Sequence, residues 1–177
     1  MRIPVKYFYA FLAFLLAFGC IYAVNLWHQQ LLVEEPLAGA LGRIEGVKDV
    51  ELNNNRKEAE VWITLGEVDN LPQIYGEIEG ILLESYEEDS IRIHLLDSRD
   101  PYLESVYHKV HFALLEAERL GNYSAMSEEI FKQLAQEKEL KNYRLWIDQK
   151  RIYLSLATSR GALYKVIPVN GERAEKG

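Results

Sequence analysis

The chain has 177 residues, of which 49% are hydrophobic and 27% charged, a composition typical of a folded protein rather than a disordered one. Its formal charge is −7, and because Arg2 and Lys6 are the only charges in residues 1–27, the rest of the chain carries −9. An acidic domain repels nucleic-acid phosphates, so we expect no nucleic acid among its partners. The single cysteine, Cys20, excludes an intramolecular disulfide and a cysteine metal cluster.

Residues 7–27 form an uncharged apolar run that predicts a transmembrane helix. As a helix the run would be roughly 31 Å long, close to the thickness of a bilayer core. Arg2 and Lys6 precede it, so the positive-inside rule predicts a cytoplasmic stub over 1–6 and an extracytoplasmic soluble domain after a stalk over 28–35. The expectation is therefore a single-pass protein of the cell membrane, with the membrane as one of its partners.

Two alternatives exist for this N-terminal segment. Small residues at Cys20 and Ala23 could frame cleavage of a signal peptide after Ala23, although the apolar run is longer than the usual apolar core of about 7–15 residues. Lipidation of Cys20 is the other alternative, and Phe18 fits a bacterial lipobox poorly. The length of the run favours the anchor.

Residues 36–97 predict a first lobe with the element order α-β-β-α-β. Apolar periodicity predicts, in chain order, a helix over 36–44, strands over 47–52 and 58–65, a helix that begins near 71, and a strand over 90–96. Asn53, Asn54 and Asn55 tolerate positive φ and predict a turn between the first two strands. This order suits a small sandwich in which helices cover one face of a three-stranded sheet.

Residues 98–169 predict a second lobe with the order α-α-β-β-β. Its expected elements are a helix from Pro101 to Gly121, a helix that begins at Ser124 or Ser127, and strands over 143–147, 151–157 and 163–169. The tail over 170–177 reads as disordered. The predicted fold class is thus α+β, with an N-terminal transmembrane helix followed by two lobes that pack together.

Three residues of the helix beginning at Pro101 could form a metal site. Glu104, His108 and His111 project within about 60° of one another on a helix, and zinc is often held by two histidines and one carboxylate. The spacing is not a recognised zinc motif, so a polar helix face is the preferred interpretation and no metal or other cofactor is expected. His94 is predicted to lie on the sheet face opposite the core, because it alternates with Ile93 and Leu95.

Phe112 and Leu115 share the polar side of the same helix and therefore predict a contact surface. Either the C-terminal sheet of this chain covers them, which is the preferred interpretation, or a separate partner does. Trp62, Trp146 and Tyr164 are out of phase with the aliphatic face of their strands, so each is expected to pack beneath the other lobe.

No catalytic residue is predicted, because the sequence has no G-x-S-x-G motif and no glycine-rich phosphate loop. The pattern Leu37-x-x-x-Leu41-x-x-Ile44-Glu45-Gly46-Val47-x-x-Val50-x-Leu52 resembles the opening of ring-building domains in secretion, sporulation and flagellar base proteins. It covers under a tenth of the chain. The first hypothesis is a non-enzymatic component of a bacterial cell-envelope complex, with a protein partner or self-association. The alternative is a membrane-tethered enzyme, or a ligand- or metal-binding module, with its site between the lobes.

Overall fold

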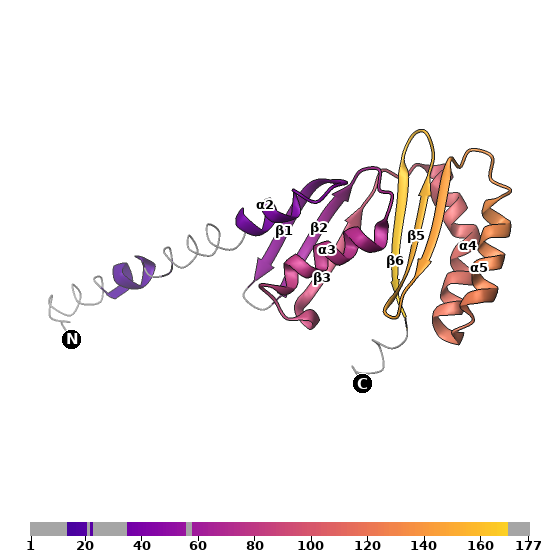
Figure 1. The fold of residues 1–177 in the computed structure, drawn as a ribbon. Helices are drawn as coiled ribbons and strands as arrows, with labels where there is room; N and C mark the ends of the chain where they lie inside the picture. The colour runs from indigo at the N-terminus through magenta and orange to yellow at the C-terminus, as the bar shows by residue number, and fades with distance from the viewer. Residues whose placement is uncertain (1–13, 21, 23–34, 56–57, 170–177) are drawn as a thin grey trace, which may run out of the picture.

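The computed structural model describes residues 14–20, 22, 35–55 and 58–169. Over these residues the protein is α+β, with two three-stranded sheets and helices packed on both of them (Figure 1).

The transmembrane helix predicted over 7–27 is corrected by the structure. Within that run the structure describes residues 14–20 and 22, which are helical. Across the described residues, no helix is both long enough and apolar enough to span a lipid bilayer. The single-pass anchor and the cell-membrane localisation derived from it are therefore not supported. The stub over 1–6, the tail over 170–177 and all of the predicted stalk except residue 35 lie outside the described residues.

The first sheet has the strand order β1-β2-β3, with β1 at Val47–Asn55, β2 at Glu58–Leu65 and β3 at Ile91–Leu96. β1 is antiparallel to β2, and β2 is parallel to β3. The turn predicted at Asn53–Asn55 is wrong, because these asparagines continue β1 and pair with the beginning of β2.

Two helices cover one face of this sheet, as the sequence predicts. They are α2 at Glu35–Leu41 and α3 at Leu71–Leu83, and a 3-10 turn at Glu88–Ser90 leads from α3 into β3. The Asn70 side chain caps α3 by accepting a hydrogen bond from the backbone N–H of Gln73 at 3.3 Å. The alternating residues of β2 that face the helices are all buried: Ala59, Val61, Ile63 and Leu65.

The second lobe contains α4 at Pro101–Leu120, α5 at Tyr123–Leu134, β4 at Asn142–Ile147, β5 at Arg151–Ala157 and β6 at Ala162–Pro168. The three strands form an antiparallel sheet in the order β4-β5-β6.

The ends of α4 are fixed by local chemistry that the sequence signals. The Asp100 side chain accepts a hydrogen bond from the N–H of Leu103 at 2.9 Å, and Gly121 ends the helix with φ 69°. The next helix begins at Tyr123, slightly earlier than either serine predicted as its start.

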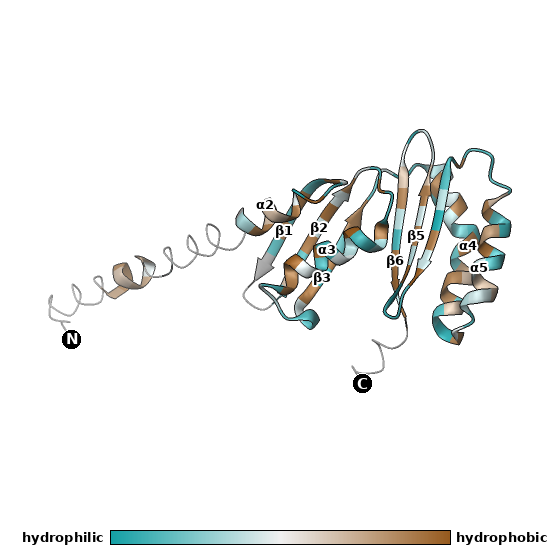
Figure 2. Cartoon of the chain, viewed as in Figure 1, coloured by the Kyte–Doolittle hydropathy of each residue, from teal (hydrophilic) through white to brown (hydrophobic). Residues whose placement is uncertain are grey.

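The second sheet is the central layer of the molecule, with α4 and α5 on one face and the first lobe on the other (Figures 1 and 2). Strand β5 shows this most clearly, because it is buried on both sides. Ile152 and Leu154 pack in the cluster with α4 and α5, whereas Tyr153 packs in the cluster formed with α2, α3 and β2. The two lobes therefore share a core, as predicted.

The Tyr164 side chain carries the most buried polar contact between the lobes. Its hydroxyl donates a hydrogen bond to the carbonyl oxygen of Gly66 at 2.7 Å and accepts one from the backbone N–H of Val68 at 3.1 Å. Tyr164 is 2% exposed, and Trp146 is partly buried in the same cluster. The expectation that these two aromatic residues pack beneath the other lobe is confirmed.

The segment between the lobes lies against the edge of β6. Asp97 accepts a hydrogen bond from the N–H of Tyr164 at 2.9 Å, and the Ser98 hydroxyl accepts one from the N–H of Ala162 at 3.1 Å. A Cβ atom at Gly161 would lie 1.9 Å from the carbonyl oxygen of Ser98, so only glycine allows this approach. The lobes are thus joined by hydrogen bonds from side chains to the backbone of β6, as well as by packing.

We predict that Tyr164→Phe destabilises the whole protein, because it leaves the buried carbonyl of Gly66 and N–H of Val68 without their partner. Such a loss costs about 1–3 kcal/mol and should lower the melting temperature by about 4–10 °C. Tyr123→Phe, which removes the same atom from α5 away from the lobe junction, is the matched control. Equal melting temperatures for the two variants would show that the Tyr164 hydroxyl does not hold the lobes together.

Candidate interaction surface and inter-lobe cleft

Helix α4 presents an apolar and aromatic surface on the side opposite its core residues. Its buried side faces α5 and the second sheet through Leu103, Val106, Val110, Leu114 and Ala117. We call the opposite side, formed by His108, His111, Phe112 and Leu115, the α4 surface. Phe112 is 74% exposed and Leu115 is 40% exposed. The expectation that the C-terminal sheet covers this pair is therefore wrong.

The rings of the α4 surface contact one another in sequence along the helix. The centroids of His111 and Phe112 are 4.4 Å apart, and those of His108 and His111 are 6.3 Å apart. Tyr107 borders the surface at 5.8 Å from His111, and the ammonium group of Lys165 lies 5.3 Å above the Tyr107 ring. These contacts hold the aromatic side chains in place while Phe112 remains open to solvent.

Two of the three residues considered as metal ligands, Glu104 and His108, are held by other partners. The carboxylate of Glu104 accepts a hydrogen bond from Arg99 at 2.9 Å, and His108 donates one from Nδ1 to the carbonyl oxygen of Glu104 at 2.7 Å. The Nδ1 atom of His111 is buried and has no hydrogen-bond partner. Over the part of the chain that the structure describes, no three histidine, cysteine or acidic side chains converge in a way that could hold a metal ion.

The face of the first sheet away from α2 and α3 carries another aromatic pair. The rings of Trp62 and His94 stack with their centroids 5.1 Å apart, and His94 donates from Nε2 to Glu60 at 3.0 Å. His94 is exposed on this face, as predicted. The expectation that Trp62 packs beneath the second lobe is wrong, because His94 on the neighbouring strand lies against its ring instead.

A cleft of about 640 Å³ lies where the two lobes meet. It is lined by α3, by β3 and by the beginning of β5 and end of β6, through residues that include Tyr75, Glu79, Ile91, Ile93, Arg151 and Val166. This volume falls within the range of about 300–1,000 Å³ that small-molecule sites occupy. We call this feature the inter-lobe cleft.

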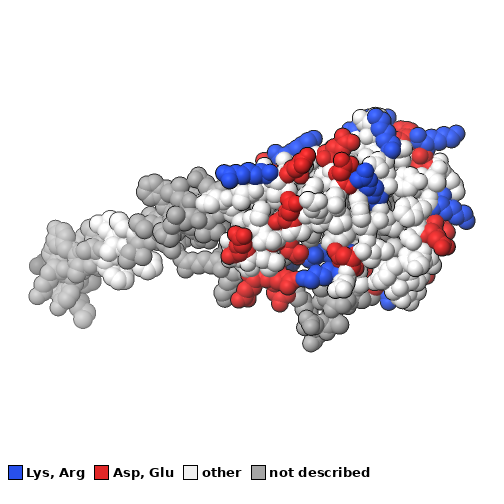
Figure 3. Space-filling model, in the orientation of Figure 1, with Lys and Arg blue, Asp and Glu red and all other residues white. Residues whose placement is uncertain are grey.

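Two ion pairs cross the inter-lobe cleft, and within each pair the opposite charges neutralise each other. Arg151 forms a two-pronged ion pair with Glu79, in which one nitrogen–oxygen distance is 3.1 Å, and its guanidinium lies 4.8 Å above the Tyr75 ring. Lys150 pairs with Glu88 at 2.6 Å. Figure 3 shows acidic and basic side chains interspersed over the visible face, in keeping with this pairing. The cleft therefore presents compensated charges rather than a field of one sign.

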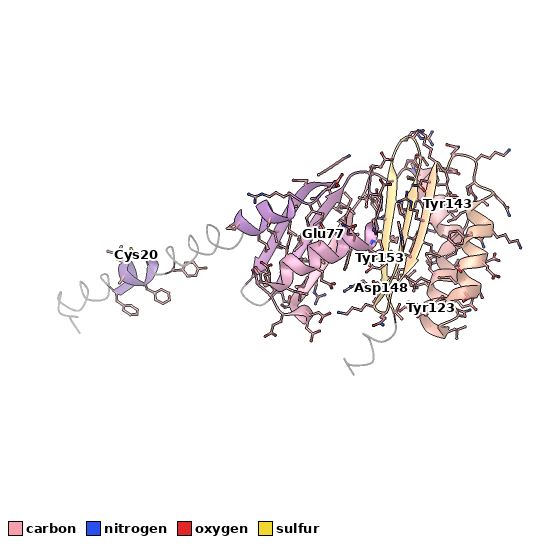
Figure 4. All side chains as sticks on the ribbon, viewed as in Figure 1. Cys20, Glu77, Tyr123, Tyr143, Asp148 and Tyr153 are labelled. Atoms are coloured by element: carbon pink, nitrogen blue, oxygen red, sulfur yellow. The ribbon has the colours of Figure 1, made fainter. Side chains whose placement is uncertain are left out.

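Tyr153 lies on β5, two residues after the cleft residue Arg151, and Asp148 lies in the turn between β4 and β5 (Figure 4). The Tyr153 hydroxyl donates to Asp148 at 2.9 Å, and its ring meets the edge of Tyr75 at 6.0 Å. Burial, together with the hydrogen bond to the Asp148 carboxylate, raises the pKa of Tyr153 to about 12. The described lining of the cleft contains no serine, cysteine or histidine.

The structure keeps the sequence-predicted site residues together on α4 but brings them near none of the cleft residues. Glu79 and Arg151 are 72 positions apart, and nothing in the local pattern of either residue indicates the other. Their pairing follows from how the lobes dock, which periodicity does not encode. An arginine at the start of a predicted strand was the only available signal, and it is a weak one.

No family model matches the chain, and no curated protein matches its sequence. Residues 37–52, which carry the resemblance to ring-building domains, form most of α2 and the first six residues of β1.

The contrast between Leu114 and Leu115 gives a direct test of the exposed α4 surface. Phe112→Ser combined with Leu115→Ser should leave the melting temperature within about 2 °C of wild type, because exposed side chains gain little from folding. Leu114→Ser, at a fully buried neighbour, should cost roughly 2–5 kcal/mol and lower it by more than about 8 °C. A comparable loss in the double variant would mean that the monomer covers Phe112 and Leu115 after all.

Proposed function

We propose that this protein is a non-enzymatic interaction component, and that another protein chain with an apolar or aromatic surface docks on the α4 surface. The observation that carries the proposal is the exposure of Phe112 on a helix whose opposite side is fully buried. Aromatic side chains of this kind are enriched at the energetic centres of protein interfaces.

The energetics support docking on this surface. Burying Phe112 and Leu115 against a partner would contribute about 1.5–3 kcal/mol for each side chain. Because α4 is anchored along its length in the second core cluster, the surface is already ordered before a partner arrives. A preordered surface loses less conformational entropy on binding, which favours association.

Binding of a small ligand in the inter-lobe cleft is the second candidate function, and the cleft volume of about 640 Å³ favours it. Such a ligand would have to fit between the Arg151–Glu79 and Lys150–Glu88 pairs or exchange with them. The two functions can be tested separately, because variants of Phe112 change the α4 surface and leave the cleft unchanged.

The docking surface is tested by photo-cross-linking in cells of the native organism. Benzoylphenylalanine in place of Phe112 should form an adduct with a protein chain on irradiation, because it would lie at the centre of the interface. The same group in place of Glu77, an exposed residue of α3, is the control (Figure 4). Absence of an adduct at position 112, or equal yields at both positions, would contradict the proposal.

A further inference from the structure

The residues on the exposed side of α4 are complementary to the same residues taken in reverse order. At 100° per residue, the α4 surface extends at its two ends to Glu104 and Arg119. The midpoint of this stripe lies between His111 and Phe112. Reversing the helix about that midpoint places Glu104 on Arg119, His108 on Leu115 and His111 on Phe112. An acid therefore meets a base, and each histidine meets an apolar side chain.

We propose that the partner of the α4 surface is α4 of a second copy of this chain, packed antiparallel about a two-fold axis that passes between His111 and Phe112. This inference rests on the proposed function and names its partner. A two-fold interface uses the same patch twice, so every contact must be complementary to its own reverse. A parallel pairing would instead place Glu104 beside the same acid of the other copy.

The side chains at both ends of the stripe are accessible for this pairing. The Glu104 side chain is 40% exposed even while it contacts Arg99, and Arg119 is exposed in the last turn of α4. In the antiparallel arrangement each Glu104 lies beside Arg119 of the other copy, at the two rims of the interface. Rim charges of this kind select orientation more than they add affinity.

The central contacts would bury the side chain that the monomer leaves most open. Phe112, which is 74% exposed, would pack on His111 and Leu115 of the other copy. From Glu104 to Arg119 the stripe is about 22 Å long, so a single pair of helices buries less than the roughly 800 Å² per partner of a stable complex. The dimer is therefore expected to be weak and dependent on protein concentration.

Cysteine cross-linking of the full chain tests the register of this dimer. The variant combines His108→Cys with Leu115→Cys in a Cys20→Ser background. In the antiparallel register, the thiol at position 108 of each copy lies opposite the thiol at position 115 of the other copy. Cα atoms of helices in contact come within the 4.4–6.8 Å that a disulfide requires. The two positions within one chain are about 10 Å apart along the helix, so they cannot bond to each other.

The single variants His108→Cys and Leu115→Cys are the matched controls, because equivalent positions of two antiparallel copies would also lie about 10 Å apart along the axis. Under mild oxidation the double variant should give at least about ten-fold more covalent dimer than either single variant, with an unchanged melting temperature of the reduced protein. Equal cross-linking in a single variant would overturn the antiparallel register, and no dimer in the double variant would overturn self-association.

Failure of this inference and failure of the proposed function give different results. If the photoreactive group at position 112 forms an adduct of twice the chain mass, the second copy is supported. If it forms an adduct with a different protein and the double-cysteine variant stays monomeric, the second copy is overturned while docking on α4 stands. If neither experiment yields a product, both proposals are overturned.

Discussion

The hydroxyl group of Tyr164 is the contact on which the arrangement of the two lobes depends. It lies on β6, nearly a hundred residues from the backbone groups of Gly66 and Val68 that it bonds. Those groups follow β2 directly, so the hydroxyl fixes the end of one sheet against the face of the other. Asp97 and Ser98 then hold the intervening segment to the edge of β6. With the lobes so joined, the second sheet becomes an inner layer, and α4 becomes an outer surface of the molecule.

The sequence predicts most of the individual elements because each depends on local chemistry. Apolar periodicity and helix caps such as Asn70, Asp100 and Gly121 place the helices and strands to within a few residues. Local chemistry fails where pairing across the sheet decides the outcome. Asn53–Asn55 read as a turn, yet they extend β1 because β2 offers partners for them. The length of the apolar run near the N-terminus predicted a membrane helix, and no described helix is both long and apolar enough to be one.

For the candidate site, too, local sequence patterns predict some features, and the packing of distant elements decides the others. Periodicity is enough to place Phe112 and Leu115 on the side of α4 away from its core. It is not enough to decide what covers them, because that depends on where the second sheet lies: it packs on the opposite side of the helix and leaves Phe112 exposed. A site between the lobes could be suggested as an alternative, but not its residues, since Arg151 and Glu79 meet only once the lobes dock.

Differential scanning calorimetry of the full chain tests most directly whether the lobes form one structural unit. A shared core and a buried polar bridge require both lobes to unfold together. We therefore expect one transition whose calorimetric enthalpy equals its van 't Hoff enthalpy, as in a two-state domain. Two separate transitions, or a calorimetric enthalpy well above the van 't Hoff value, would contradict the account, because the lobes would then unfold independently and α4 would not be presented on a common scaffold.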